Sequence, residues 1–437
     1  MKIRSIGLVA LGLGLLPDAL GQLDFTLNTM LADGMWNNPT SIAVDSAGVI
    51  HVAFMTQFDT DSNTKEIWYA SDAGGEWTFE QITDNAVREE FPSLTLDAAE
   101  NVHIAFHTGV TTSNKIRYTN NVAVAFIEPI DITGSGFVIV EHAVDSAGNV
   151  HFAFQDQISG TSITDVYYRM WSPTTGLGPL LNLSNTPTTR ELQADIAVDS
   201  LDVVHVVFRG GSISSGPLTY MNNSTGSFVS LPTGVAVADD PLIEIDEADR
   251  ITIVYEAGDA LYLIESLPGG GFTSPLLLTT APGLYRPAFM DKFAIDADGR
   301  RHIAFVSNVN TQGAFVISEG QSGFSPPQLI ENPTGSKVGT SIAVNAAGRM
   351  ALTYQFGYVV DDIVQADIRL GTAQLGGGCT GDLDGDGDVD LPDLATLLSN
   401  FGRSGDAGPA DGDTDGDLDV DLADLATLLS NFGSACP

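Results

Sequence analysis

Two acidic segments near the C-terminal end have the clearest chemical pattern in the chain. They are DLDGDGDVDLPD (382–393) and DTDGDLDVDLAD (413–424). A twelve-residue calcium loop supplies oxygen ligands from positions 1, 3, 5, 7, 9 and 12, with position 7 acting through its backbone carbonyl. Hard carboxylate oxygens suit calcium, whereas zinc prefers cysteine and histidine. The pattern predicts two calcium sites, one formed by Asp382, Asp384, Asp386, Asp388, Asp390 and Asp393, the other by Asp413, Asp415, Asp417, Asp419, Asp421 and Asp424.

A short amphipathic helix is expected after each loop, with apolar residues at the spacing of one helix face. Pro392 falls in the first turn of the first helix, and Gly402 and Gly433 follow the last turns, which is typical of helix boundaries. Position 6 of the loop is Gly387 in the first copy but Leu418 in the second, so we expect the second calcium site to be weaker. We expect the helices to bury their apolar stripes against each other; these are Leu394, Leu397, Leu398 and Phe401, and Leu425, Leu428, Leu429 and Phe432.

The only two cysteines, Cys379 and Cys436, bracket this acidic region. In an oxidising compartment they would form one disulfide, and two free thiols remain the alternative. A domain this small needs such a staple, which would add about 2–5 kcal/mol by constraining the unfolded chain.

The loop, its single exiting helix and the near-identical second copy resemble a type I dockerin over residues 379–437. The resemblance implies that the aspartates above bind calcium and that the folded module docks on a cohesin domain of a scaffold or cell surface. Bearers of such modules are often polysaccharide-degrading enzymes. Loop positions 10 and 11, often small and polar in that family, read the partner; here they are Leu391-Pro392 and Leu422-Ala423, which departs from the usual cohesin pattern.

A unit of about fifty residues recurs seven times before this module. In each copy an apolar strand ends at an anchor residue, a turn follows, and three more strands complete a meander. The first two strands are apolar on both faces, so each small sheet must be covered on both sides. We therefore predict a mainly β chain, with a seven-bladed β-propeller over residues 22–373, a Gly-rich linker at 374–378 and a small all-α module at 379–437. The segment 25–33 should complete the last blade. The anchors are Asp45, Asp97, Asp145, Asp199, Asp246, Asp296 and Asn345.

The anchor carboxylates are interpreted as turn formers that accept hydrogen bonds from amides two or three residues further on. Glycines that follow them would supply the left-handed conformation; these are Gly48, Gly148, Gly299 and Gly348. Five blades carry a histidine six residues after the anchor, and we favour a structural role for it, in blade packing or in a hydrogen bond to the neighbouring strand, over a metal site. These are His51, His103, His151, His205 and His302.

The loops that enter each blade are the expected ligand-binding mouth of the propeller. They carry Trp36, Arg88, Arg190, Arg286 and Lys337, about nine residues before the anchors. Guanidinium groups facing one cavity could bind a carboxylate or glycan. The simpler alternative, which we favour, is that these groups pair with acidic neighbours at the rim.

The segment SDAGGEWTF (71–79) resembles a weakened Asp-box, the turn of sialidases and related propellers. The resemblance supports the fold and not an activity, because that turn is remote from catalysis in those families. No catalytic residue is selected by the sequence.

Residues 1–21 have the layout of a secretory signal peptide, with cleavage expected after Gly21. No other apolar stretch is long enough to span a bilayer, and a net charge of −38 argues against nucleic-acid binding. We therefore expect a secreted propeller carried to a complex or surface by its calcium module, and the sequence leaves open whether the propeller is catalytic while favouring that it is not. One alternative is a carbohydrate-active enzyme, sialidase-like or another glycoside hydrolase, targeted by the same module. Another is a calcium-dependent anchor or stability cap without a cohesin partner.

Overall fold

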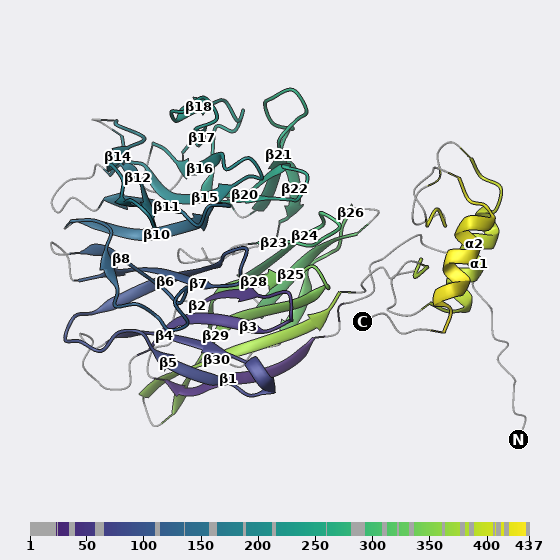
Figure 1. Ribbon diagram of the computed structural model, residues 1–437, viewed down its shortest axis with the longest axis horizontal. Coiled ribbons are helices and arrows are strands. Elements are labelled where there is room, and N and C mark those ends of the chain that lie inside the picture. The colour runs from purple at the N-terminus through teal and green to yellow at the C-terminus, as the bar shows by residue number, and fades with distance from the viewer. Residues whose placement is uncertain are drawn as a thin grey trace, which may run out of the picture.

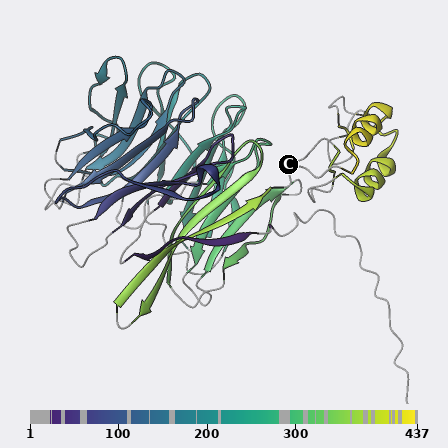
Figure 2. The ribbon, with the colours of Figure 1, turned by 60° about the horizontal axis from the view of Figure 1, so that its bottom comes forward.

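Seven antiparallel sheets form the main body of the protein (Figures 1 and 2). The computed structural model describes residues 23, 25–34, 40–56, 65–109, 114–134, 136–156, 164–186, 189–211, 216–258, 260–280, 293–307, 313–320, 323–331, 336–360, 363–375, 381–383, 389–404, 407, 412–414 and 419–433. The innermost strands of all seven sheets line one central channel of about 370 Å³. The innermost strand of the seventh sheet packs against that of the first, which closes the ring. The predicted seven-bladed propeller is confirmed.

Each blade begins with its innermost strand. The first three blades are β2 (Thr40–Val44), β3 (Ile50–Thr56), β4 (Glu66–Ser71) and β5 (Thr78–Gln81); β6 (Glu89–Leu96), β7 (Val102–Thr108), β8 (Lys115–Asn120) and β9 (Ile130–Asp131); and β10 (Phe137–Val144), β11 (Val150–Asp156), β12 (Val166–Ser172), β13 (Gly176–Leu177) and β14 (Leu181–Asn182). The fourth and fifth are β15 (Leu192–Val198), β16 (Val204–Arg209), β17 (Leu218–Asn222) and β18 (Val229–Leu231), then β19 (Asp239–Ile245), β20 (Ile251–Ala257), β21 (Ala260–Glu265) and β22 (Leu276–Thr279).

The sixth blade is β23 (Ala294–Ile295), β24 (Arg301–Ser307), β25 (Gly313–Gly320), β26 (Gly323–Phe324) and β27 (Gln328–Glu331). The seventh is β28 (Ser336–Val344), β29 (Arg349–Val360), β30 (Ile363–Gln374) and β1 (Thr26–Gly34). A short 3-10 helix, η1 (Ala73–Gly75), lies in the Asp-box-like turn, and the C-terminal module holds α1 (Leu391–Asn400) and α2 (Leu422–Asn431). Among the described residues, no helix has the length and apolar character needed to cross a bilayer.

The N-terminal strand β1 is the outermost strand of the seventh blade. It pairs antiparallel with β30, from Thr26 opposite Thr372 to Gly34 opposite Ala366. The first and last parts of the propeller are therefore joined by a ladder of backbone hydrogen bonds within one sheet.

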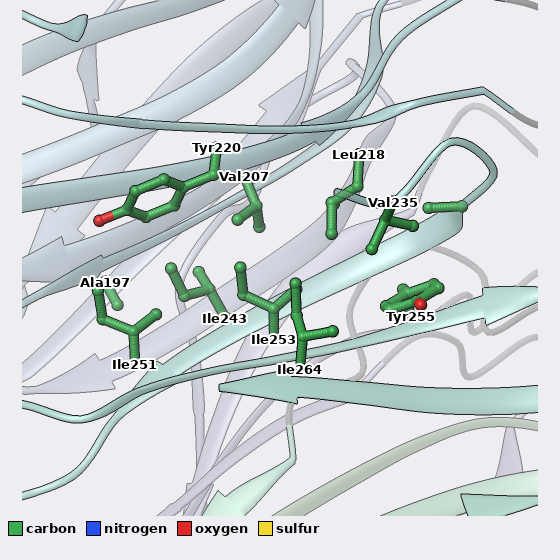
Figure 3. Packing of buried hydrophobic residues seen from close by; sticks show 11 residues of the cluster. Ala197, Val207, Leu218, Tyr220, Val235, Ile243, Ile251, Ile253, Tyr255 and Ile264 are labelled. Carbon is green, nitrogen blue, oxygen red and sulfur yellow. The ribbon is translucent and has the colours of Figure 1, made fainter. Parts of the chain in front are cut away.

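Apolar clusters between neighbouring blades explain why the inner strands are apolar on both faces. In the cluster of Figure 3, Val207 and Tyr220 of the fourth blade pack against Ile243 and Ile253 of the fifth. Val207, Ile243 and Ile253 are fully buried. Each inner strand contributes one face to the cluster before it and the other face to the cluster after it.

The anchor carboxylates close the turns as expected, although the amides lie two and four residues further on. Asp97 Oδ1 accepts hydrogen bonds from the amides of Ala99 and Asn101, each at 2.9 Å. The third residue after the anchor has positive φ in all seven turns, and four of these residues are the predicted glycines. The other three are Glu100, Asp202 and Asp249, with φ of 63°, 60° and 57°.

Those three acidic residues are held by the preceding blade. Glu100 accepts a hydrogen bond from the amide of Ser46, Asp202 from Ser146 and Asp249 from Ser200, each at 2.8 Å. Serine directly follows the anchor only in the three turns that donate these hydrogen bonds. In the four turns without an acidic residue at the positive-φ position, that position is glycine. An inter-blade hydrogen bond thus offsets the strain of a left-handed residue that has a side chain.

The repeated histidines connect the first, second and third strands of a blade. In the third blade, His151 Nε2 lies 3.1 Å from Asp145 Oδ2, and its Nδ1 lies 2.7 Å from the Tyr168 hydroxyl. Because a carboxylate only accepts, the imidazole proton is on Nε2 and Nδ1 accepts from tyrosine. The first, second and fourth blades repeat this arrangement, and the sixth uses Ser318 in place of tyrosine. The predicted structural role of these histidines is confirmed, in the form of a hydrogen bond to the neighbouring strand.

Burial lowers the pKa of the His103, His151 and His205 imidazoles below the ordinary value, against the opposing effect of the anchor carboxylates. The folded protein therefore favours the neutral rings. Their contribution to stability is complete above the ordinary histidine pKa of about 6.5 and is lost as the pH falls through the lowered values.

We predict that Tyr168→Phe destabilises the protein by about 1–3 kcal/mol, because His151 Nδ1 would remain buried without a donor. Tyr262→Phe is the matched control: no hydrogen bond of the Tyr262 hydroxyl is seen in the described part of the chain, so the change should stay within about 0.5 kcal/mol. Urea unfolding measures both. Equal effects of the two substitutions would contradict the proposed role of the tyrosine.

Candidate functional site

The two helices of the C-terminal module begin where the sequence predicts, and each starts with a capping box formed by two aspartates. Asp390 and Asp421 are the N-cap residues of α1 and α2. Asp393, at loop position 12, accepts hydrogen bonds from the amides of Leu383 at 2.6 Å and Asp390 at 2.7 Å. Asp424 does the same with Thr414 and Asp421, each at 2.7 Å. Each position-12 carboxylate therefore ties the start of its loop to the start of its helix.

The described loop residues fit a divalent cation. Asp393 and Asp424 are completely buried, and Asp413 is 2% exposed. Carboxylate oxygens of Asp419, Asp421 and Asp424 lie within 4.8 Å of one another. Carboxylates this close repel each other unless a cation or a proton intervenes. A carboxylate has about four acceptor positions, so the amide bonds leave capacity for a metal ion. An all-oxygen set of this kind suits calcium.

Several predicted positions of the module fall outside the described residues. These are Asp384, Asp386, Asp388, Asp415, Asp417, Gly387, Leu418, Cys379 and Cys436. The expected signal peptide and residues 376–378 of the linker lie outside them too. The complete ligand sets, the weaker second site and the disulfide stay predictions.

The expectation that the two apolar stripes bury each other is wrong for half of each stripe. Leu397 and Leu428 are fully buried, whereas Leu398 and Leu429 are 54% and 51% exposed. Phe401 and Phe432 are also exposed, as are Leu391 and Leu422 at the helix starts.

Two glycines give the physical reason for this difference. A Cβ on Gly381 would lie 3.0 Å from the Cα of Leu428, and one on Gly412 would lie 3.0 Å from the Cα of Leu397. The segment that leads into each loop therefore packs directly on the helix of the other repeat. That packing covers one leucine per helix and leaves a matching apolar face, Leu391, Leu398 and Phe401 or Leu422, Leu429 and Phe432, on each.

The predicted basic residues of the propeller mouth are only partly described. Arg88 precedes β6 and pairs with Glu90, which is the rim pairing that we favoured. Arg190 forms an isolated bridge with Thr164, and its carbonyl accepts from the Gly211 amide at 3.0 Å. Lys337 lies in β28, while Trp36 and Arg286 are outside the described residues.

A ring of buried polar residues at this mouth was missed by the sequence reasoning. It lies ten residues after the anchor on each second strand, away from the anchor turn and at or near the end of the strand in the first six blades. Five blades carry a polar residue there, none more than 6% exposed, and Met55 and Val306 occupy the other two positions. The residue six positions after the anchor is histidine in five blades, whereas the residue ten positions after it differs from blade to blade. An alignment of the repeats shows this difference, so the sequence did contain a signal for these residues. The five are His107, Gln155, Arg209, Glu256 and Gln355.

A bulge with positive φ disrupts the innermost strand at the same mouth in five blades. Each bulged residue lies six positions before its anchor. Positive φ is a marked outlier for a bulky or β-branched residue, and such strain concentrates where a strand re-aims side chains at a functional site. The five are Phe91 (54°), Ile139 (51°), Gln193 (58°), Asp240 (43°) and Gly339 (57°).

Glu90 holds the charged groups of the second-blade mouth together. Lys65 Nζ lies 2.8 Å from its Oε1, Arg88 contacts the same oxygen, and His107 Nε2 lies 3.6 Å from its Oε2. Burial alone would raise the pKa of Glu90, but hydrogen bonds from His107, Arg88 and Lys65 lower it to about 2. Glu90 is therefore ionised at any physiological pH.

Glu66, at the start of β4, behaves in the opposite way. Burial raises the pKa of Glu66 to about 7, and the neighbouring Glu89 adds to this. The hydrogen bonds donated by the Thr83 hydroxyl at 2.6 Å and the Asn85 amide at 3.1 Å reduce the shift without cancelling it. Carboxyl groups with widely separated pKa values thus lie at the junction of the first two blades.

Comparisons with known proteins show the fold alone. No family model matches the chain, and no curated protein matches its sequence. A polysaccharide lyase described as an ulvan lyase superposes with a TM-score of 0.50 and 9% identity, over 77% of this chain and 94% of that one. A leech intramolecular trans-sialidase gives 0.45 and 10%, over 79% and 70%. A protein of unknown function from Dyadobacter fermentans gives 0.45 and 9%, over 78% and 98%.

We predict that Glu66→Gln becomes progressively more stable relative to the parent protein as the pH rises from about 5.5 to 8.5. The folded pKa of about 7 lies above the ordinary 4.5, so the stability due to this group is complete below 4.5 and is lost as the pH rises through 7. Glutamine mimics the neutral acid at every pH. Urea midpoints measure the effect, with the exposed Glu80→Gln as control, and parallel pH curves for both variants would contradict a raised pKa.

Proposed function

We propose that this chain is a secreted β-propeller protein carried to a complex or cell surface by its C-terminal calcium module. The module, residues 379–437, would be a dockerin-like domain that docks on a cohesin-type partner. The observation that carries this proposal is the pair of matching exposed apolar faces on α1 and α2, each placed directly after a loop whose position-12 carboxylate is buried.

The exposed faces support a docking role. Three large apolar side chains per helix, 40–71% exposed, form more apolar surface than so small a module would otherwise leave in water. Apolar side chains at helical spacing are the usual means by which a helix binds a partner surface. Because the two faces match residue for residue, either helix presents the same chemistry.

Calcium would control whether these faces exist. Helices of ten residues are marginal in water by themselves. The core of the module is small, with Val389, Leu397, Val420 and Leu428 fully buried. A cation bridging the loop carboxylates would hold each loop against its helix, so metal removal should unfold the docking faces.

We predict that Asp393→Asn and Asp424→Asn each abolish one of two calcium-binding events in the full-length protein. Asparagine keeps the volume but lowers the charge that the cation needs. Titration calorimetry counts the events, and circular dichroism follows the loss of helix. Asp298→Asn, in an exposed propeller turn, is the control that should change neither. Two undiminished binding events in both loop variants would refute the assignment.

We predict that the full-length protein is retained by cohesin domains in calcium and released by chelator. Leu398→Lys combined with Leu429→Lys should reduce retention at least tenfold without loss of calcium binding, because both side chains are exposed. Leu201→Lys, at a 77% exposed propeller leucine, is the matched control. Calcium binding without retention by any cohesin would favour the alternative of an anchor or stability cap.

A second candidate function is binding or processing of carbohydrate by the propeller mouth. The observation that favours it is the ring of buried His, Gln, Arg and Glu side chains that differs between blades, since such groups hydrogen-bond hydroxylated ligands. The shared fold with the ulvan lyase is compatible with this candidate and does not select a reaction.

A further inference from the structure

The mouth of the second blade combines features that the propeller fold does not require. We propose that it is a subsite for one pyranose ring of a polysaccharide, with Phe91 against the ring face and with Arg88, Lys65 and His107 bonded to ring oxygens and hydroxyls. This inference rests on the second candidate function, because it names the place and the ligand class.

Glu90 is not needed to hold the sheet together. It lies seven residues before its anchor, and the equivalent residues of the third, fourth and seventh blades are Val138, Leu192 and Val338. In the fifth blade the equivalent residue is Asp239, which forms an ion pair with Arg209 at 3.1 Å, so an acid occurs at this position in the second and fifth blades and an apolar residue in these three. A buried ion pair is commonly less stabilising than an apolar replacement of similar size. The Glu90 cluster therefore calls for an explanation beyond stability.

The cluster fixes cationic donors beside a partly exposed aromatic ring. Lys65 and Arg88 both contact Glu90, which restricts their side chains before any ligand arrives. The Arg88 side chain is 34% exposed, so part of it remains accessible. Groups oriented in advance in this way lose little conformational entropy on binding a ligand.

His107 retains an unused acceptor. It is 5% exposed, its Nε2 faces Glu90, and its Nδ1 is buried without a hydrogen bond in the part of the chain that the structure describes. In the neutral tautomer that carries its proton on Nε2, toward the Glu90 carboxylate, Nδ1 is an acceptor that needs an O–H or N–H donor. A buried acceptor without a donor costs about 1–3 kcal/mol, which a ligand hydroxyl would recover. Among common ligands, sugars supply such donors in quantity.

Phe91 supplies the apolar face that a pyranose needs. Its ring stacks on His107, with the ring centroids 5.0 Å apart and the planes at 30°. Its φ of 54° is strained, and the seventh blade places Gly339 at the equivalent bulge. The bulge therefore does not require an aromatic residue. Phe91 remains partly exposed at the mouth.

The test substitutes glycine at two equivalent bulges of the full-length protein. Phe91→Gly removes the aromatic ring and relieves strain, so the fold should keep or raise its melting temperature. Ile139→Gly makes the same backbone change in the third blade. Calorimetric titrations use cellotetraose as a neutral probe and tetragalacturonate and an alginate tetramer as acidic probes. We expect at least one probe to bind, Phe91→Gly to weaken it at least tenfold, and Ile139→Gly to stay within twofold.

Further readouts separate the possible failures. The His107 imidazole signal in a histidine-labelled NMR spectrum should shift when the ligand binds, which a purely structural Phe91 would not cause. Binding only of acidic probes, with loss on Arg88→Gln, would assign a carboxylate contact to Arg88. Binding that is equally affected by both glycine variants would overturn the subsite and leave the carbohydrate candidate standing. No binding of any probe would overturn both, with no effect on docking by the C-terminal module.

Discussion

The side chain that ends the first strand of each blade, a carboxylate in six blades and the Asn345 amide in the seventh, makes the contact on which the propeller depends. In the third blade, Asp145 Oδ1 closes the turn by accepting from the amides of Ala147 and Asn149, while Oδ2 holds His151. His151 in turn accepts from Tyr168 on the third strand. One side chain thus connects three strands. Because these polar atoms find partners inside their own sheet, the blade faces can be apolar and pack closely against neighbouring blades.

This arrangement divides every second strand into a constant and a variable end. The histidine near the turn is held by two partners and recurs in five blades, whereas the residue four positions further along changes from His107 to Gln155 to Arg209. Both ends are buried, so burial alone does not explain the difference. The turn end is fixed by the network that it must complete. The residues at the mouth end share no hydrogen-bond network that recurs from blade to blade. The side chain at that position can therefore differ between blades.

Features set by a local or repeated pattern could be predicted from the sequence, and features set by contacts between units could not. The anchors and the turn glycines follow from turn chemistry, and the seven blades follow from a repeat whose strands need cover on both faces. In contrast, Leu397 and Leu398 belong to one helical stripe, and only the packing of Gly412 on Leu397 decides which of them is buried. Positive φ at a phenylalanine has no propensity signal, so the bulge at Phe91 was not foreseen. Once the structure is known, the repeat alignment identifies the bulge position, since all five bulges lie six residues before an anchor.

The propeller and the C-terminal module compensate their buried charges in different ways, and this difference determines how calcium would act. In the described propeller, Glu90 meets Lys65 and Arg88 within the protein itself. In the module, Asp393 and Asp424 are fully buried and accept hydrogen bonds from backbone amides, and Asp424 also accepts one from the Thr414 hydroxyl at 3.2 Å. An amide donor offsets part of the desolvation of a carboxylate but not its repulsion by the other loop aspartates. A divalent cation offsets both. Under the proposed function, calcium concentration governs the module and its exposed apolar faces and leaves the propeller unchanged, so that chelation releases the protein from its partner without unfolding its main body.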